Sequence, residues 1–120
     1  MRFRLGLIGL GAIGKQIIAA ADSGALPGVE VAAILVRTPR SAEDRVTADP
    51  ARFFGHKLDA VAEGAGHQAV RDHGERALES GADLLITSVG ALTDDGLRER
   101  LVAAATRNKR RLILPSAGIG

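Results

Sequence analysis

The sequence feature that most constrains the fold is the glycine pattern Gly9, Gly11 and Gly14. It follows Leu5–Ile8, a segment of apolar residues and one glycine, as in strands that are buried on both faces. It precedes Ala12–Ser23, where apolar side chains recur at helical spacing. A glycine turn in this context is typical of dinucleotide-binding domains. Gly9 would then permit the tight turn, Gly11 would let the backbone approach a pyrophosphate, and Gly14 would let the helix pack closely on the strand.

The helix expected after this turn is suited to hold a phosphate. Unpaired N–H groups near Ala12 and Ile13 can donate to an anion, and no acidic side chain stands in the first turn to repel it. The other interpretation is a glycine-rich turn that binds nothing. The flanking strand and helix patterns favour the binding turn.

The rest of the chain alternates between two periodicities. Apolar runs typical of buried parallel strands occur at Val29–Val36, Ala60–Ala62, Leu84–Thr87 and Leu112–Leu114. Helical spacing recurs in Gln68–Ser80 and again after Thr93, the expected N-cap of the last helix. This order predicts an α/β fold of the Rossmann type, a doubly wound parallel sheet in a single domain.

The segment Thr38–Lys57 has no clear period. We expect it to be a long connection with one helical turn near Pro50–Phe54.

The residues after the second strand bear on the choice between NAD and NADP. An NAD-specific site usually carries Asp or Glu there to hold the ribose 2′-hydroxyl, whereas this chain continues Leu35-Val36-Arg37-Thr38 without an acid. Arg37 and Arg40 could hold a 2′-phosphate through charge-assisted hydrogen bonds. We therefore expect NADP or NAD as the cofactor, with NADP favoured. The alternative is that both arginines are solvated loop residues.

Composition excludes several other classes of function. The chain has no cysteine and hence no disulfide or thiolate metal site, and no run of about 20 apolar residues that could span a bilayer. A net charge of +2 is too small to indicate nucleic-acid binding. The basic run Arg107–Arg111 has no interleaved aromatic residues and is interpreted as a solvated helix end. We expect a cytoplasmic protein without a metal, nucleic-acid or membrane partner.

The three histidines do not form a catalytic constellation. His73 falls near an apolar helical stripe and is interpreted as a packed residue, and His56 lies in the irregular segment. His67 follows the third strand and is the one histidine that could reach a cofactor. No metal-ligand cluster or Ser/His/Asp arrangement has recognisable spacing, so no catalytic residue is assigned.

Four motifs, in order, resemble the L-aspartate dehydrogenase family. They are Gly11-Ala12-Ile13-Gly14, Val61-Ala62-Glu63-Gly64-Ala65, Ser88-Val89-Gly90-Ala91-Leu92 and Pro115-Ser116-Ala117-Gly118-Ile119-Gly120. Three features depart from the family. The acid after the second strand is missing, Ala117-Gly118 reverses the family's order, and the chain ends at Gly120 where the family continues into a second domain.

The resemblance implies an NAD(P)-dependent oxidoreductase that converts L-aspartate to iminoaspartate, or runs the reverse amination. It implies that Ala12 and Ile13 lie along the pyrophosphate and that other motif residues border the two riboses and the nicotinamide. Together with Arg37 and the glycine turn, the expected cofactor-binding residues are Gly9, Gly11, Ala12, Ile13, Gly14, Arg37, Gly64, Ala65, Ser88, Val89, Ser116, Ala117 and Gly118.

The family's second domain carries its catalytic histidine and most of its substrate pocket. We therefore expect residues 1–120 to be the NAD(P)-binding domain, not catalytically complete alone. The alternative is a stand-alone dinucleotide-binding or sensing module without enzymatic activity, although the Pro115–Gly120 motif favours the first interpretation. Apolar surface at the last strand is expected to cause self-association, most simply as a homodimer.

Overall fold

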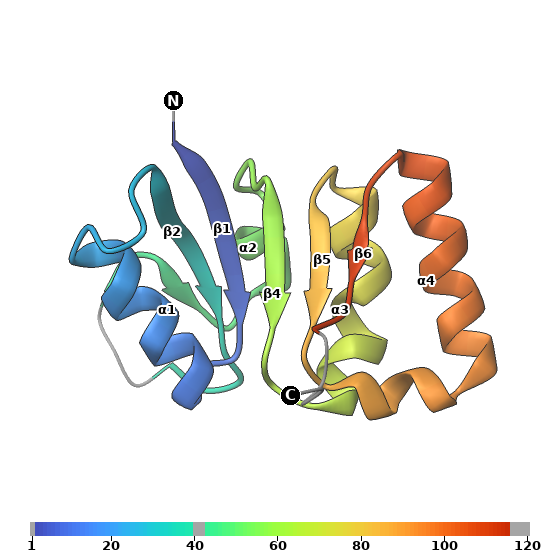
Figure 1. The fold of residues 1–120 in the computed structure, drawn as a ribbon. Helices are drawn as coiled ribbons and strands as arrows, with labels where there is room; N and C mark the ends of the chain where they lie inside the picture. Colours follow the sequence, from blue (N-terminus) through green and yellow to red (C-terminus); the bar gives the residue numbers. More distant parts are fainter. Residues whose placement is uncertain (1, 40–42, 116–120) are drawn as a thin grey trace.

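Six parallel strands form one sheet with helices on both faces (Figure 1), as the alternating periodicities predict. The computed structural model describes residues 2–39 and 43–115. The strands are β1 (Phe3–Ile8), β2 (Val29–Leu35), β3 (Val46–Thr47), β4 (Ala60–Glu63), β5 (Asp83–Ile86) and β6 (Leu112–Ile113), in the order β3-β2-β1-β4-β5-β6. All neighbours pair in parallel, which confirms the Rossmann-type fold class.

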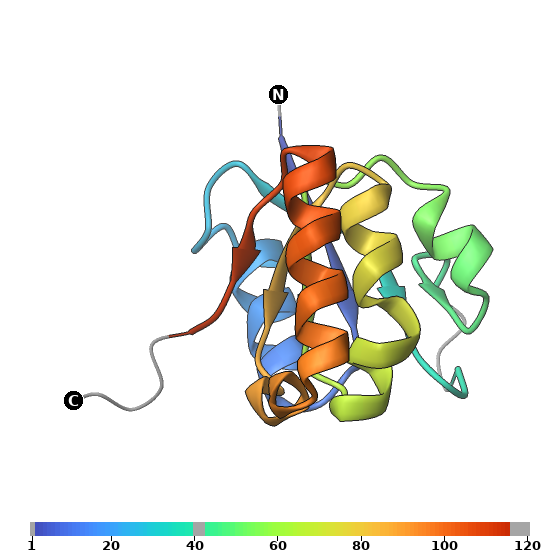
Figure 2. The same ribbon diagram turned by 90° about the vertical axis from the view of Figure 1, so that its right-hand side faces the viewer.

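The helices divide between the two faces of the sheet. Helix α1 (Ala12–Asp22) packs on one face, against a small apolar cluster that includes Leu7. Helices α2 (Pro50–Phe54), α3 (His67–Glu79) and α4 (Asp95–Asn108), with the 3-10 helix η1 (Val89–Thr93), cover the other face and enclose the larger core. Figure 2, turned by 90°, shows α1 and α3 on opposite sides of the strands. Leu7 and Ile8 belong to different clusters because successive side chains of a strand point to opposite faces.

The α1 face is covered unevenly. In Figure 1, helix α1 lies at the β2 side of the sheet, and no helix of the described residues covers β5 and β6 on that face. Leu112 packs against the larger core, so the next side chain, Ile113, faces the other way and is 37% exposed. Leu114 follows at 47% exposed.

The irregular segment contains one element that the sequence did not predict. Strand β3 pairs Val46 with Ile34 and Thr47 with Leu35 at the sheet edge. A two-residue strand is too short to produce a periodic pattern. The helical turn expected at Pro50–Phe54 is confirmed as α2, which begins after Asp49, whose side chain accepts a hydrogen bond from the Ala51 N–H.

The expected N-cap of the last helix is wrong by one residue. Thr93 ends η1 and its hydroxyl donates to the carbonyl of Gly90. Asp94 is the N-cap of α4 and its carboxylate accepts from the Leu97 N–H at 3.1 Å. Both residue types cap helices well, so sequence preference alone could not separate them.

Candidate functional site

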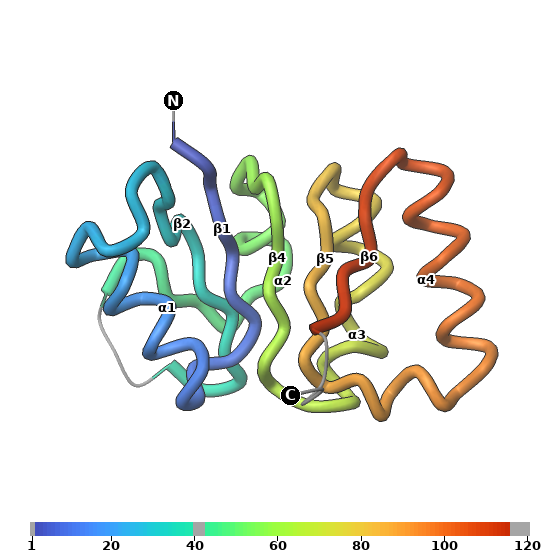
Figure 3. The backbone as a smooth tube through the Cα atoms, viewed as in Figure 1, coloured from blue at the N-terminus to red at the C-terminus, as the bar shows by residue number. Residues whose placement is uncertain are grey.

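The two halves of the sheet diverge at β1 and β4. From β1 the chain winds outward through β2 and β3, and it then returns to β4 and winds the other way through β5 and β6 (Figure 3). Ligands of open α/β sheets bind at the carboxyl ends of the strands where this reversal occurs. The glycine turn follows β1 at this point, and Gly64 and Ala65 follow β4. The topology therefore brings these two sets of predicted residues together.

The glycine turn has the backbone geometry expected of it. Gly9 has φ +97°, a conformation that L side chains rarely adopt. A Cβ on Gly14 would lie 3.1 Å from the carbonyl oxygen of Gly9, so a glycine there lets α1 start close against the strand. Gly11 has no heavy atom within 4 Å of where a Cβ would stand, apart from its own chain neighbours. The turn is tight at two glycines and open to solvent at the middle one.

The start of α1 differs from the starts of the other α-helices in the described parts of the chain. Asp49 caps α2, Asp94 caps α4, and the carboxylate of Glu63 accepts from Gly66 at the start of α3. Helix α1 has Gly11 as its N-cap, no side-chain capping bond and no acid in its first turn. Its first N–H groups and its positive dipole end therefore remain available to an anion.

A pocket of about 180 Å³ opens beside the glycine turn. It brings together Gly9, Arg37 and Ala65, three of the predicted residues, from three separate segments. The side chain of Arg37 is exposed and makes no hydrogen bond or ion pair with any other described residue. Sequence reasoning missed the other lining residues, which are Ile8, Leu35, Val36, Ala48, Pro50, Ala69, Asp72 and His73.

His73 lines this pocket rather than only packing in the core. Its ring lies 6.3 Å from that of Phe54, centre to centre, and burial lowers the pKa of the imidazole below its ordinary value, outweighing the opposite effect of Asp72. Four of the eleven lining residues come from α2 and α3, whose positions against the sheet depend on tertiary packing. Helical periodicity places His73 at the border of an apolar stripe but cannot show that it borders a pocket.

The remaining described site residues lie farther along the same edge. Ser88 and Val89 follow β5, and Val89 is 37% exposed. His67 begins α3, and its imidazole packs against Gly90. The contact is so close that a Cβ on Gly90 would stand 2.7 Å from the His67 Nε2. Glu63, which sequence reasoning did not select as a site residue, joins these loops through its buried carboxylate. Ser116, Ala117, Gly118 and Arg40 lie outside the described residues.

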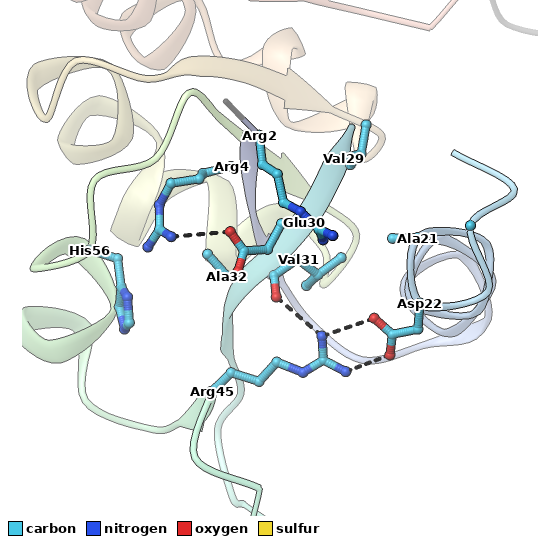
Figure 4. Close-up of a pocket in the computed structure, with 11 residues that line it drawn as sticks. Arg2, Arg4, Ala21, Asp22, Val29, Glu30, Val31, Ala32, Arg45 and His56 are labelled. Atoms are coloured by element: carbon cyan, nitrogen blue, oxygen red, sulfur yellow. Dashed lines mark hydrogen bonds and ion pairs between the residues drawn. The ribbon is translucent and has the colours of Figure 1, made fainter. Parts of the chain in front are cut away.

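A larger concavity of about 610 Å³ lies at the opposite edge of the sheet, around the amino ends of β1 and β2 (Figure 4). Four of its charged side chains are paired with one another. Arg45 binds both carboxylate oxygens of Asp22 and the carbonyl of Val31, and Arg4 lies 3.2 Å from Glu30. Because ligands of this fold bind at the carboxyl ends of the strands, the smaller pocket is the better candidate.

The basic run near the end of α4 is also largely paired. Arg107 lies 3.6 Å from Glu79, and Arg111 lies 3.2 Å from Asp83. Within residues 2–39 and 43–115, no group of three or more His, Asp or Glu side chains is placed to hold a metal ion. None of the helices described there has the length and apolar character needed to cross a membrane.

Comparison with known proteins gives a consistent result. Residues 9–115 match the family model described as homoserine dehydrogenase, NAD binding domain. L-aspartate dehydrogenase 2 of Bordetella bronchiseptica is 36% identical over 99% of this chain and 46% of its own length, and L-aspartate dehydrogenase of Archaeoglobus fulgidus is 34% identical over 97% and 47%.

The crystal structure of aspartate dehydrogenase from Thermotoga maritima has the same fold, with a TM-score of 0.73 at 23% identity over 100% of this chain and 48% of that chain. The resemblance carried by the four motifs is thereby confirmed. The chain spans about half the length of the curated relatives it matches.

Proposed function

The chain belongs to the family of NAD-binding domains described for homoserine dehydrogenase, and we propose that it is the cofactor-binding domain of an L-aspartate dehydrogenase-like oxidoreductase. The observation that carries the proposal is the uncapped start of α1 at the point where the sheet reverses direction. In such a domain the bound nicotinamide ring supplies the hydride chemistry. The chain's own residues bind and orient the dinucleotide.

The geometry of the site suits a dinucleotide whose pyrophosphate lies at the start of α1 and whose two halves extend in opposite directions from it. The pyrophosphate would lie against Gly11, Ala12 and Ile13, where N–H groups are free and no Cβ fills the space at Gly11. The adenosine half would enter the pocket of about 180 Å³, with Ala65 and the apolar side chains as its walls. The nicotinamide half would then extend over β4 and β5, toward Ser88 and Val89.

We further propose that NADP is preferred over NAD. The guanidinium of Arg37 stands at the pocket rim without a partner among the described residues, and no acid follows β2. A 2′-phosphate there would gain a charge-assisted hydrogen bond, whereas a 2′-hydroxyl would gain a weaker one. Asp72 also lines the pocket, where its carboxylate accepts a hydrogen bond from the Gln68 side chain at 2.8 Å.

Oxidation of L-aspartate also needs a base for the ammonium proton and cations for the substrate carboxylates. We propose that these groups lie outside residues 1–120, in keeping with the length of the relatives. The 120-residue chain should therefore bind the cofactor without turning over L-aspartate.

The test is a titration of the chain with NADPH and NADH, followed by nucleotide fluorescence, and repeated with Arg37→Asp. We expect NADPH to bind more tightly and the substitution to reverse the order, since a carboxylate repels a 2′-phosphate and accepts from a 2′-hydroxyl. Arg52→Asp, a charge reversal at an exposed residue outside the pocket, is the matched control. If neither nucleotide binds, the proposed function is rejected. L-aspartate-dependent reduction of NADP would reject the proposal that the catalytic groups lie outside residues 1–120.

A further inference from the structure

Glu63 is a buried acid at the carboxyl end of β4, with its residue 1% exposed. Its carboxylate accepts four hydrogen bonds. Oxygen Oε2 accepts from the N–H groups of Ala65 and Gly66 and from the hydroxyl of Ser88, each at 2.8 Å, and Oε1 accepts from the Ser88 N–H at 3.0 Å. These four donors satisfy most of the hydrogen-bonding capacity of the carboxylate.

These bonds join two loops that are far apart in the sequence. Ala65 and Gly66 belong to the loop between β4 and α3, and Ser88 lies between β5 and η1. The backbone adds to the connection, because the carbonyl of Glu63 accepts from the Thr87 hydroxyl at 2.7 Å and from the Thr87 N–H at 3.2 Å. One residue therefore sets the relative position of two segments that border the proposed cofactor site.

The burial of this charge is compensated without a cation. No Lys, Arg or His among the described residues forms an ion pair with Glu63. The four donors replace the hydration of the carboxylate, and the positive end of the α3 dipole lies at the same place, because Gly66 is the N-cap of α3. The acid is thus held in the structure and does not face the site as a free base.

The direction of the Ser88 hydrogen bond has a chemical consequence. The Ser88 hydroxyl donates its one hydrogen bond to Glu63, so only its oxygen lone pairs are left for a ligand. A serine oriented in this way accepts a hydrogen bond from a hydroxyl and cannot donate one to a carbonyl or phosphate.

We infer that Glu63 is a positioning residue of the cofactor site, which fixes Ser88 as an acceptor for a ribose hydroxyl of the nicotinamide half of the dinucleotide. The inference rests on the proposed function. Beyond the proposed function, it states that Glu63 holds the two loops together and that Ser88 receives a ribose hydroxyl.

Glu63→Gln should affect the two loops differently. A side-chain amide has one oxygen and one NH₂, so it can satisfy the Ala65 and Gly66 N–H groups only by turning its NH₂ toward the Ser88 N–H. The variant should therefore lose the bond from the Ser88 N–H and shift the Ser88 loop, while the bonds from the Ser88 hydroxyl and from Thr87 remain and the loop after β4 stays in place. We expect affinity for the whole dinucleotide to fall about tenfold, as for the loss of one good hydrogen bond. Affinity for the adenosine half alone should not change.

The measurement is a calorimetric titration of the 120-residue chain with NADPH and 2′,5′-ADP, and with NADH and ADP. If the wild-type chain binds none of these, the proposed function fails. If the wild-type chain binds them, two results would show that the inference about Glu63 is wrong. Glu63→Gln could lower the affinities for whole and half nucleotides equally, or it could lower neither. Ser88→Ala should reproduce the effect, and the double variant should be no weaker than either single variant, because both changes remove the same contact.

Asp83→Asn is the matched control. Asp83 is the other buried acid among the described residues and stands at the opposite end of the neighbouring strand β5, where it binds Arg111. Its substitution should lower the unfolding temperature and leave the ratio of NADPH to 2′,5′-ADP affinity unchanged. A ratio altered as much as in Glu63→Gln would show that any loss of a buried acid has this effect, and would overturn the positioning role.

Discussion

A Cβ on Gly9 would lie 2.8 Å from the Cβ of Ala65, so the turns after β1 and β4 touch at this point. Real Cβ atoms essentially never come so close, and the φ of +97° at Gly9 adds backbone strain to the steric conflict. Gly9→Ala should therefore lower the free energy of unfolding by about 2 kcal/mol or more. Urea denaturation followed by circular dichroism measures this loss.

Gly11→Ala is the informative companion to that variant. Gly11 has φ −84° and ψ −163°, which alanine adopts freely, and the space around its Cβ position is open. Stability should change by less than about 0.5 kcal/mol. Affinity for NADPH should fall at least tenfold, because the new methyl group would occupy the space proposed for the pyrophosphate. Undiminished binding by Gly11→Ala would contradict the placement of the phosphates at α1.

Acid should weaken the domain through Asp83. Burial raises the pKa of Asp83, but hydrogen bonds from the backbone and side chain of Arg111, with the charges of Arg111 and Arg110, outweigh it and hold the pKa below its ordinary value. A lowered folded-state pKa stabilises the fold above the unfolded value, about 3.9, and this stabilisation is lost as the pH falls below it. The Arg111 side chain is 78% exposed, so most of the stabilisation comes from its backbone N–H.

Asp83→Asn should thus cost about 1.5–3 kcal/mol at pH 7 and progressively less as the pH falls below 4. Unfolding midpoints in urea for both proteins between pH 7 and pH 3 give the comparison. A constant difference across that range would show that Asp83 does not titrate with folding.

His73 should produce a second pH dependence nearer neutrality. Its pKa is lowered, chiefly by burial, so the folded state favours the neutral ring. Below about pH 6.5 the imidazole is protonated in the unfolded chain but still neutral in the folded one. The free energy of unfolding should therefore fall between that pH and the lower pKa of His73 in the folded state. His73→Gln should remove this part of the slope, while His56→Gln, at an exposed residue, should keep it. Equal slopes in all three proteins would contradict the assignment.

The elements that could be predicted are those with long periodic patterns. Leu5–Ile8 and the helix after it carry enough apolar positions to fix the glycine turn between them, and the same holds for the strands and helices downstream. The pocket could not be predicted, because His73 and Pro50 meet there only through the packing of α2 and α3. Glu63 was quoted as part of a motif, but its four hydrogen bonds depend on β4 and β5 being neighbours.

Self-association should depend on the uncovered face at β6. Ile113 is 37% exposed and Leu114 47%, and among the described strands β6 stands at the edge, where its outer backbone groups can pair with another chain. We expect the 120-residue chain to form a dimer that Ile113→Lys dissociates, since a charge in an apolar contact is costly to bury. Val102→Lys is the control, because Val102 is 50% exposed on α4, away from this face. Sedimentation at several concentrations separates the cases. A wild-type monomer at high concentration, or equal dissociation by both variants, would show that this face does not mediate assembly.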